Sequence, residues 1–296
     1  MSLPYLTRAQ APLTTEIDVV NEYGQLHKVS IPAERALTVY VDKRELVTLM
    51  TLGAHPELLV LGYLRNQRLV TTVHDIESIT VDWEVGAAAV KTRHGIENIE
   101  EKTAHRVVTT GCGQGSVFGG LMDEVDQIEL PADVSITQSQ LYGLVNTIRL
   151  KETTYKSAGS VHACALFAVT AGDPEMLLFV EDVGRHNAID TIAGWMWMQE
   201  ISGAPRLVFY TTGRLTSEMV IKSAQMGVPI VVSRSGITQM GHQVAQSVGL
   251  CAIGRATHKR FLCYTGAHRL KMEPGLVLKP ALSPEARPQS VSAQDA

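Results

Sequence analysis

The spacing of hydrophobic positions differs between the two parts of the chain. In the first part, short apolar runs predict strands, because successive side chains of a strand point to opposite faces. Pro56 opens a stretch of helical spacing at residues 56–67, as is typical of a first helical turn. The turn Asp42-Lys43-Arg44 predicts a hairpin. The predicted strands cover residues 36–41, 45–52, 78–85 and 105–110.

From residue 160 onward, strand-like runs alternate with segments of helical spacing. In the segment 188–200, for example, Ile189, Ile192, Trp195 and Met196 fall on one helical face. This alternation is typical of βαβ units, so we expect a largely parallel sheet. The strands are predicted at 161–169, 176–182, 206–213, 228–236, 251–256 and 260–266, and the helices at 188–200, 217–227 and 242–250.

A polar segment beginning at residue 121 separates the two patterns and leads into a predicted helix around 137–150. We therefore expect a β-rich N-terminal domain over residues 15–130, which ends in a glycine-rich loop around Cys112, and an α/β domain over residues 131–272. Residues 1–14 are expected to be flexible. The tail 273–296 is polar and rich in Pro and Ser, which predicts disorder.

Composition narrows the class of protein. The chain has 296 residues, of which 45% are hydrophobic, with a net charge of −4, and this charge argues against general nucleic-acid binding. Its N-terminus lacks the features of a signal peptide, and no 18 apolar residues run together, so we expect a soluble protein without a membrane span. The four cysteines form neither a disulfide scaffold nor a zinc motif, which fits a reducing cytoplasm.

Polar segments rich in small residues follow four successive predicted strands. The carboxyl ends of parallel strands meet at one edge of a sheet, where ligands bind. Each segment carries arginine, whose guanidinium suits phosphate, and two lead directly into helices. This edge therefore predicts a site for a phosphate-bearing ligand. The segments are 181–187, 211–218, 233–238 and 254–260, with Arg185, Arg214, Arg234, Arg255 and Arg260.

Each of these side chains also has an ordinary structural interpretation. A single arginine at a strand end is often solvated or salt-bridged, and Asp182 could pair with Arg185 or cap the next helix. His186 could be a capping or core histidine, and His162 lies inside an apolar strand, where an interior role is the more common one.

Cys112 lies in the segment TTGCGQGSVFGG, residues 109–120. The glycines match neither a P-loop nor the dinucleotide fingerprint G-x-G-x-x-G. Two interpretations of Cys112 stay open from spacing alone: a thiol on a swinging loop that carries a group, or an unreactive thiol in an interdomain connection. The other cysteines, Cys164, Cys251 and Cys263, lie in apolar runs, where a thiol is usually a small buried hydrophobe.

Four separated motifs, in one order, resemble formate dehydrogenase accessory proteins of the FdhD type over roughly residues 30–270. The most specific is EDVGRHNAID at 181–190, followed by TTGRLTSEMVIKSAQMGVPIVVSRSG at 211–236. The segments VYVDKRELVTLMTLGAHPELLVLGYL at 39–64 and GSVHACALF at 159–167 resemble two earlier signatures of the family.

The resemblance implies a cytidine-deaminase-like three-layer α/β core with a β-rich N-terminal domain, in a homodimer. It implies a sulfurtransferase that takes persulfide sulfur from a cysteine desulfurase and passes it to the bis-molybdopterin guanine dinucleotide cofactor of molybdenum or tungsten, the cargo needed by the formate dehydrogenase catalytic subunit. A guanine nucleotide is expected to bind the same site. The zinc motifs of the deaminases, H-x-E and P-C-x-x-C, are missing, so no structural metal is expected.

The resemblance also assigns residues. Cys112 would carry the persulfide, and the stretch 255–260 together with the strand-end residues would hold the dinucleotide. His186 or Asp182 is expected to assist proton movement, and Asn187 and His162 are further candidates for a supporting role. The expected cofactor-binding residues are Arg255, Ala256, Thr257, His258, Lys259, Arg260, Arg185, Gly213, Arg214, Ser233 and Ser235.

One departure from the family concerns the loop, which commonly carries C-x-x-C. Here Gly115 stands at the second cysteine position, so no disulfide can form within the loop. A single cysteine is chemically sufficient to relay sulfur. The alternative is a non-catalytic chaperone that binds and delivers the cofactor, which the missing cysteine favours. A nucleotide hydrolase or deaminase lacks a recognisable metal triad or nucleophile–base pair.

Overall fold

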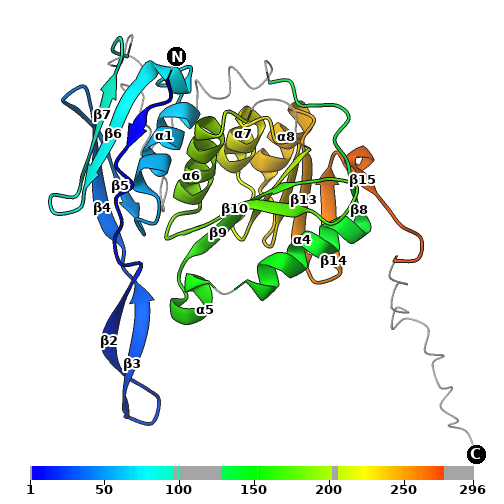
Figure 1. The fold of residues 1–296 in the computed structure, drawn as a ribbon. Helices are drawn as coiled ribbons and strands as arrows, with labels where there is room; N and C mark the ends of the chain where they lie inside the picture. The colour runs from blue at the N-terminus through cyan, green and yellow to red at the C-terminus, as the bar shows by residue number, and fades with distance from the viewer. Residues whose placement is uncertain (1, 97–98, 100–127, 152, 202–205, 277–296) are drawn as a thin grey trace, which may run out of the picture.

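Two large β-sheets, two smaller two-stranded sheets and the helices packed on them make up the computed structural model, which describes residues 2–96, 99, 128–151, 153–201 and 206–276 (Figure 1). The predicted strand at 105–110 and Cys112 lie outside the described residues, as does most of the predicted tail. Where the chain is described, no helix is long and apolar enough to cross a membrane.

The first sheet has five strands in the order β1-β6-β7-β4-β5. Its inner face packs on helix α1 (Pro56–Asn66), because alternate residues such as Leu37 and Val39 point inward. The predicted hairpin is confirmed: Asp42 and Lys43 join its two strands with φ of 46° and 73°. The strands are β1 (Tyr5–Leu6), β4 (Arg35–Val41), β5 (Arg44–Thr51), β6 (Ile76–Asp82) and β7 (Ala87–Thr92), with a short 3-10 helix η1 (Val73–Asp75) before β6.

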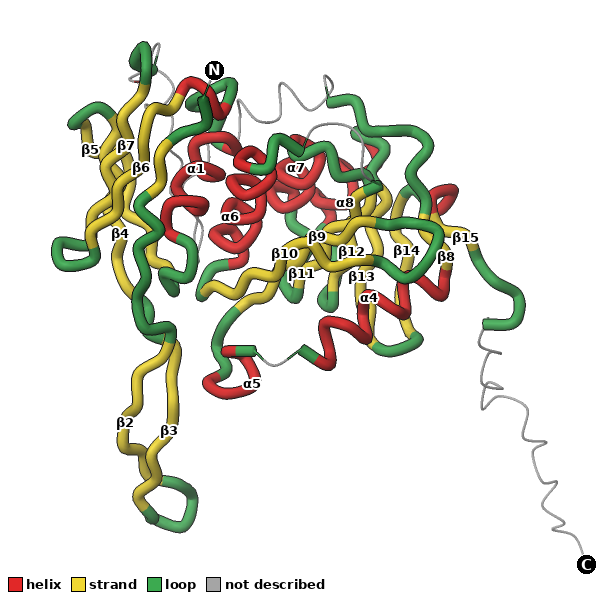
Figure 2. The backbone as a smooth tube through the Cα atoms, viewed as in Figure 1, coloured by secondary structure: helices red, strands yellow, loops and turns green. Residues whose placement is uncertain are grey.

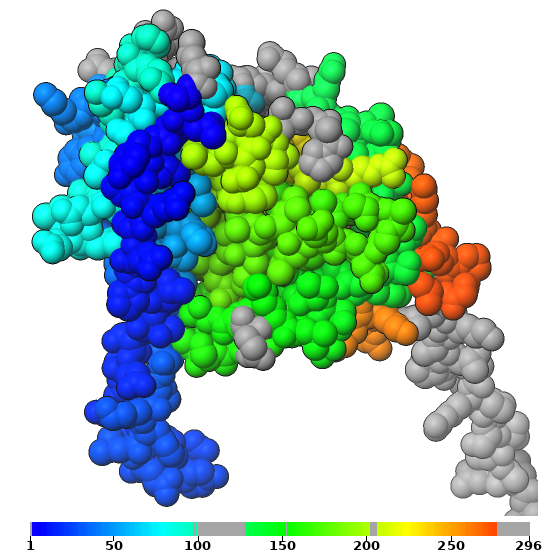
Figure 3. Space-filling model, viewed as in Figure 1, coloured from blue at the N-terminus to red at the C-terminus, as the bar shows by residue number. Residues whose placement is uncertain are grey.

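The first residues of the chain are bound to this sheet. Strand β1 runs parallel to β6, and the Thr7 hydroxyl and the Ala9 amide both donate to the Glu57 carboxylate at 2.6 Å. Part of the stretch predicted to be flexible is thus held in place. Beyond it, the hairpin of β2 (Thr14–Val20) and β3 (Leu26–Pro32) extends from the body as an arm (Figure 3).

The second sheet has six strands in the order β10-β9-β11-β12-β13-β14. Helices α6 (Arg185–Met198), α7 (Ser217–Gln225) and α8 (Gln239–Ser247) cover one face, and α4 (Gln138–Leu150) covers the other (Figures 1 and 2). This arrangement is the predicted three-layer core. The strands are β9 (His162–Ala168), β10 (Glu175–Asp182), β11 (Leu207–Thr211), β12 (Ile230–Ser233), β13 (Cys251–Thr257) and β14 (Arg260–Thr265).

The prediction of a largely parallel sheet is wrong, because most neighbouring strands of the second sheet pair in antiparallel fashion. Only β11–β12 and β12–β13 pair in parallel, whereas β10–β9, β9–β11 and β13–β14 are antiparallel. The short turns at 169–174 and 258–259 cannot make a crossover, so the strands they join must reverse direction. Because β9 lies between β10 and β11, the strands β10, β11, β12 and β13 still point the same way, each joined to the next by a helix.

Short elements complete the second domain. Helix α5 (Thr154–Ala158) precedes β9, and η3 (Ala267–Arg269) leads to β15 (Leu270–Lys271), which pairs with β8 (Ile136–Thr137). Thr137 caps α4, since its hydroxyl accepts from the Gln140 amide at 3.2 Å while the Gln140 side chain accepts from the Thr137 amide at 3.0 Å. The domain division predicted at residues 130–131 stays a prediction, because the segment before residue 128 is not described.

Helices α1 and α6 join the two sheets at a very close crossing. A Cβ added at Gly62 would lie 1.6 Å from the carbonyl oxygen of Asp190, and one at Gly194 would lie 2.0 Å from that of Leu58. Two hydrogen bonds flank the crossing, from Arg65 to the Ala193 carbonyl at 2.8 Å and from Asn66 to the Asp190 carboxylate at 2.6 Å. The missing side chains at the two glycines allow this contact.

A buried ionic network lies beside the crossing. The Lys222 ammonium is fully buried, 2.9 Å from Asp190 and 3.4 Å from Glu218. Burial alone would lower the pKa of Lys222, but Asp190 and Glu218 raise it above its ordinary value. Lys222 is therefore charged and neutralises carboxylates that the interior could not otherwise hold.

Candidate functional site

The polar segments predicted to share one edge of the sheet do so. Strands β10, β11, β12 and β13 end there, because they point the same way. The first residue of β9, His162, belongs to the same edge, since β9 runs in the opposite direction and His162 lies across from Asp182. The edge thus gathers side chains from five neighbouring strands.

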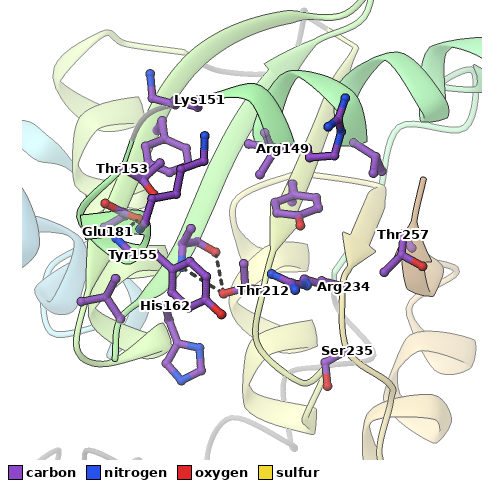
Figure 4. A pocket seen from close by; sticks show the side chains of 18 of the residues that line it. Arg149, Lys151, Thr153, Tyr155, His162, Glu181, Thr212, Arg234, Ser235 and Thr257 are labelled. Carbon is purple, nitrogen blue, oxygen red and sulfur yellow. Dashed lines mark hydrogen bonds between the residues drawn. The ribbon is translucent and has the colours of Figure 1, made fainter. Parts of the chain in front are cut away.

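A cavity of about 540 Å³ opens at this edge, on the face of the sheet covered by α4 (Figure 4). Its walls come from the end of α4, from α5, and from the ends of the strands. The lining residues are Val145, Ile148, Arg149, Lys151, Thr153, Tyr155, Lys156, Val161, His162, Ala163, Phe179, Glu181, Tyr210, Thr212, Arg234, Ser235, Ala256, Thr257 and His258.

The cavity has a positive electrostatic character. Four cationic side chains line it: Arg149, Lys151, Lys156 and Arg234. The carboxylate in the lining, that of Glu181, accepts from the backbone amides of Thr154 at 2.7 Å and Tyr155 at 3.2 Å, so it caps α5. The excess of cations favours an anionic ligand.

Aromatic and hydroxyl groups make up the rest of the wall. Tyr155, Phe179 and Tyr210 offer flat apolar surfaces, and the Lys151 ammonium lies 5.0 Å from the centre of the Phe179 ring. Burial raises the pKa of Tyr210 to about 12, so its phenol is protonated and able to donate a hydrogen bond. Thr212 is held in place, because its hydroxyl accepts from the Ala163 amide at 3.0 Å (Figure 4).

His162 is half-buried and contributes to the cavity wall. Its pKa is lowered, first by burial and then by the positive charges of Arg185 and Arg214. At neutral pH the ring is uncharged and can donate one hydrogen bond and accept another. The electrostatic effect of Arg185 and Arg214 on His162 shows that both guanidinium groups lie near this part of the edge.

Six of the residues expected from the sequence line this cavity: His162, Arg234, Ser235, Ala256, Thr257 and His258. A second cavity of about 590 Å³ adjoins it through Thr257 and is lined by Arg255, Lys259 and Arg260, together with Gln138, Tyr142, Phe261, Leu262 and Met272. The stretch 255–260 is thus divided between two neighbouring cavities. Ala256 contributes only a buried methyl group, 2% exposed.

Gly213 and Ser233 shape the edge without lining either cavity. A Cβ at Gly213 would lie 2.8 Å from Cδ of Arg185, so the glycine makes room for that side chain. The buried Ser233 hydroxyl donates to the Gly213 carbonyl at 2.6 Å and accepts from the Ser235 amide at 2.9 Å. Together these contacts tie the loop after β12 to the loop after β11.

Asp182 and Asn187 lie at the joint between the two domains. The Asp182 carboxylate accepts from the Thr51 hydroxyl at 2.5 Å, from the Leu52 amide at 3.0 Å, and from the side chain of Asn187 at 2.8 Å. Asn187 also donates to the Met50 carbonyl at 2.6 Å. Burial raises the pKa of Asp182 despite these bonds. Both side chains hold the first sheet against the start of α6, and neither lines the cavity.

His186 faces the ionic network rather than the cavity. Its Nδ1 lies 3.3 Å from the Glu218 carboxylate, and its side chain is buried. Burial, followed by the charge of Lys222, lowers the pKa of His186 to about 3. The ring is therefore uncharged near neutral pH.

Several lining residues were missed by reasoning from the sequence. Arg149 lies at the end of α4, and Lys151, Tyr155 and Lys156 come from the connection between α4 and β9, for which the sequence predicted no binding role. A usable signal is present: three cations fall within eight residues immediately before a strand whose start lies at the polar edge. The described parts of the chain contain no cluster of His, Cys, Asp or Glu side chains that could hold a metal ion.

Comparison with known proteins identifies the group to which the chain is similar. The family model described as the FdhD/NarQ family matches residues 32–271. A protein of Bacillus subtilis (strain 168) named "Sulfur carrier protein FdhD" is 30% identical over 253 residues, which cover 84% of this chain and 94% of the relative. A protein of the same name from Geobacillus kaustophilus (strain HTA426) is 28% identical, over 81% of this chain and 89% of the relative.

A solved structure shares the fold. A protein from Desulfotalea psychrophila, described as a candidate formate dehydrogenase accessory protein, superposes with a TM-score of 0.68 at 22% identity, over 88% of this chain and all of that one. The predicted fold class, an α/β core with a β-rich N-terminal domain, is confirmed by this match and by the sheets described above.

Proposed function

The chain belongs to the FdhD/NarQ family, and on this premise we propose that it is a sulfur carrier in the maturation of formate dehydrogenase. In this proposal, Cys112 takes persulfide sulfur from a cysteine desulfurase. The chain then passes the sulfur to bis-molybdopterin guanine dinucleotide with bound molybdenum or tungsten, before this cargo enters the formate dehydrogenase catalytic subunit. The protein works in the cytoplasm as a homodimer.

The observation that carries the proposal is the cationic, partly aromatic cavity at the strand edge. A guanine dinucleotide has phosphates and flat heterocyclic rings. Arg149, Lys151, Lys156 and Arg234 supply positive charge for the phosphates, and Tyr155 and Phe179 supply surfaces on which a ring can stack. A volume of about 540 Å³ lies in the range of small-molecule sites and suits one nucleotide of the cargo.

Neighbouring groups support anion binding in the same place. The protonated phenol of Tyr210 and the Thr212 hydroxyl can donate hydrogen bonds to phosphate oxygens. Arg185 and Arg214 add positive potential near His162. The adjoining cavity, with Arg255, Lys259 and Arg260, offers a place for the rest of a dinucleotide.

The proposed sulfur transfer is balanced at each step. The Cys112 thiolate attacks the terminal sulfur of the desulfurase persulfide, an S–S bond forms on Cys112, and the desulfurase cysteine leaves as a thiolate. No electrons are gained or lost in this step, because the sulfane sulfur moves from one thiol to another. In the second step two external thiols reduce the persulfide and are themselves oxidised to a disulfide; the S–S bond on Cys112 breaks, Cys112 returns to its thiol form, and the terminal sulfur is delivered to the cargo at the oxidation level of sulfide.

Mass spectrometry tests the sulfur-carrying step. After incubation with a cysteine desulfurase and L-cysteine, intact-mass analysis should show a gain of one sulfur atom that a thiol reductant removes. The gain should be absent from Cys112→Ala and retained by Cys164→Ala, which removes a buried cysteine instead. Sulfur on another cysteine, or none while the desulfurase is active, would reject the proposal.

A chaperone that binds and delivers the cofactor without sulfur chemistry is the second candidate, favoured by Gly115 in place of the second loop cysteine. The two functions differ in one measurement. Cys112→Ala should abolish activation of formate dehydrogenase if Cys112 carries sulfur, with GDP binding unchanged. Full activation by Cys112→Ala would establish the chaperone instead.

A further inference from the structure

Two cysteines far apart in the sequence meet on neighbouring strands. Cys251 begins β13 and Cys263 lies within β14, and their Sγ atoms are 4.0 Å apart. Both thiols belong to the apolar cluster on the α4 side of the sheet, so they point to the same face. The two sulfurs must approach each other by about 2 Å to reach the length of an S–S bond.

Cys164 is a contrasting case among the described cysteines. It is fully buried in β9, and its thiol donates to the Thr211 hydroxyl at 3.4 Å. The neighbour of the Cys164 thiol is therefore a hydroxyl group, whereas Cys251 and Cys263 are each other's neighbours. Proximity to a second sulfur distinguishes the pair from an ordinary buried cysteine.

The two thiols of the pair differ in their access to solvent. Cys251 is 0% exposed, whereas Cys263 is partly exposed on β14, the last strand of its sheet. A small oxidant can thus reach Cys263 first. The buried Cys251 is then the thiol that reacts second. This division of roles is what a two-step disulfide exchange requires.

The backbone at this point is irregular. The register of β13 and β14 shifts between the pairs Ala252–Thr265 and Ile253–Cys263, as in a β-bulge. In place of regular ladder bonds, the Thr265 hydroxyl donates to the Leu250 carbonyl at 2.7 Å and accepts from the Ala252 amide at 3.1 Å. A covalent link between Cys251 and Cys263 would hold the two strands together where the ladder is interrupted.

We propose that Cys251 and Cys263 form a reversible dithiol–disulfide site that reacts with small disulfides of the glutathione type. The thiolate of Cys263 attacks one sulfur of the small disulfide, which gives a mixed disulfide and releases one thiol. The Cys251 thiolate then attacks the Cys263 sulfur and releases the second thiol. The protein loses two electrons and two protons, and the small disulfide is reduced to two thiols.

The disulfide would act on the hairpin that lines both cavities. Strands β13 and β14 are joined by the turn at 258–259, and residues 255–260 at this end contribute to each cavity. A bond at the other end of the hairpin restricts the relative sliding of the two strands. This inference does not depend on the proposed function, because neither thiol is among the residues that line the two cavities.

Titration of the full-length protein against defined ratios of oxidised and reduced glutathione tests the site. In Cys112→Ala, which removes the loop thiol, intact mass should fall by two hydrogen atoms, and peptide mapping should find a bond between Cys251 and Cys263. Dithiothreitol should restore the original mass. Amide exchange over residues 255–262 should be slower in the oxidised protein than in the reduced one.

Two matched variants complete the test. In Cys263→Ser the two-hydrogen loss should disappear, whereas Cys164→Ser should oxidise as the parent does. A glutathione adduct that stays on Cys263 without closure, a bond to a cysteine outside the pair, or no reaction across the titration would each overturn the proposal. Peptide mapping of the oxidised parent protein identifies the bonded cysteines directly, so that readout does not depend on the folding of a variant.

Discussion

Replacing Gly62 by alanine should separate the two helices that join the domains. The added Cβ would meet backbone atoms only: the Asp190 carbonyl oxygen at 1.6 Å, its carbon at 2.5 Å and the Gly194 nitrogen at 2.7 Å. Ordinary contact begins at 3.4 Å, which leaves a shortfall of about 1.8 Å. Since no flexible side chain can yield, α1 and α6 must move apart.

The cost follows from what this movement disturbs. Overpacking against backbone costs about 2 kcal/mol. The bonds from Arg65 to the Ala193 carbonyl and from Asn66 to Asp190, now 2.8 and 2.6 Å long, would be stretched or lost at about 1 kcal/mol each. Alanine's higher helix propensity returns about 1 kcal/mol. The net loss in the free energy of unfolding is about 3 kcal/mol.

Urea denaturation and thermal melting measure this loss. The expected decrease in Tm is roughly 6–12 °C for a domain of this size. Gly143→Ala on α4 is the matched control, because its added Cβ would meet the Asp173 and Pro174 side chains at 3.6 and 3.7 Å, which are ordinary contacts. The control should be stabilised by up to about 1 kcal/mol.

A loss below about 1 kcal/mol in Gly62→Ala would refute the reasoning, because it would mean that the helices do not cross in backbone contact. A loss of similar size in Gly143→Ala would also refute it. In that case the cost would reflect alanine in any helix rather than the crossing.

Three further predictions concern ionisable residues. Arg234→Ala should weaken GDP binding about tenfold in calorimetry, whereas Arg206→Ala, at the opposite edge of the sheet, should not; equal effects would contradict the assigned cavity. Lys222→Met leaves the Asp190 and Glu218 carboxylates buried without a cation and should cost about 3–5 kcal/mol in urea denaturation. Lys91→Met, from an exposed pair, should cost less than about 1 kcal/mol, and a comparable cost would argue against burial as the cause. His186 has a pKa lowered from 6.5 to about 3, so below pH 6.5 the unfolded chain takes up the proton first and stability falls as pH falls towards about 3. From about pH 7.5 to about pH 5, His186→Gln should therefore lose roughly 2 kcal/mol less stability than the parent, and parallel pH profiles would contradict this.

The sequence alone determined the type and order of most elements. The run of β11, α7, β12, α8 and β13 follows directly from local spacing, because a strand or helix buries one face and its period shows in the residues. The polar edge was predicted as well, because the polar residues that form it directly follow each of these strands in the sequence. The expected residues Arg234, Ser235, Ala256, Thr257 and His258 line the cavity for that reason.

Sequence reasoning was less able to assign roles within the edge. Asp182 ends β10 and Asn187 lies in the first turn of α6, close to the edge in sequence as Ser235 is, yet their side chains bind Thr51, Leu52 and Met50 of the other domain. Which face of the sheet a side chain joins depends on a partner more than 100 residues away. Local spacing carries no record of that partner.

Only the tertiary structure decided the pairing of the strands, the outer wall of the cavity and the meeting of Cys251 with Cys263. Strand β9 lies between β10 and β11, which places His162 at the edge, and Arg149, Lys151, Tyr155 and Lys156 close the cavity from the α4 side. The two thiols come within 4.0 Å through a register shift. Whether a segment forms a helix or a strand depends on residues close in sequence. These contacts instead depend on which faces of distant segments pack together and on the register in which distant strands pair.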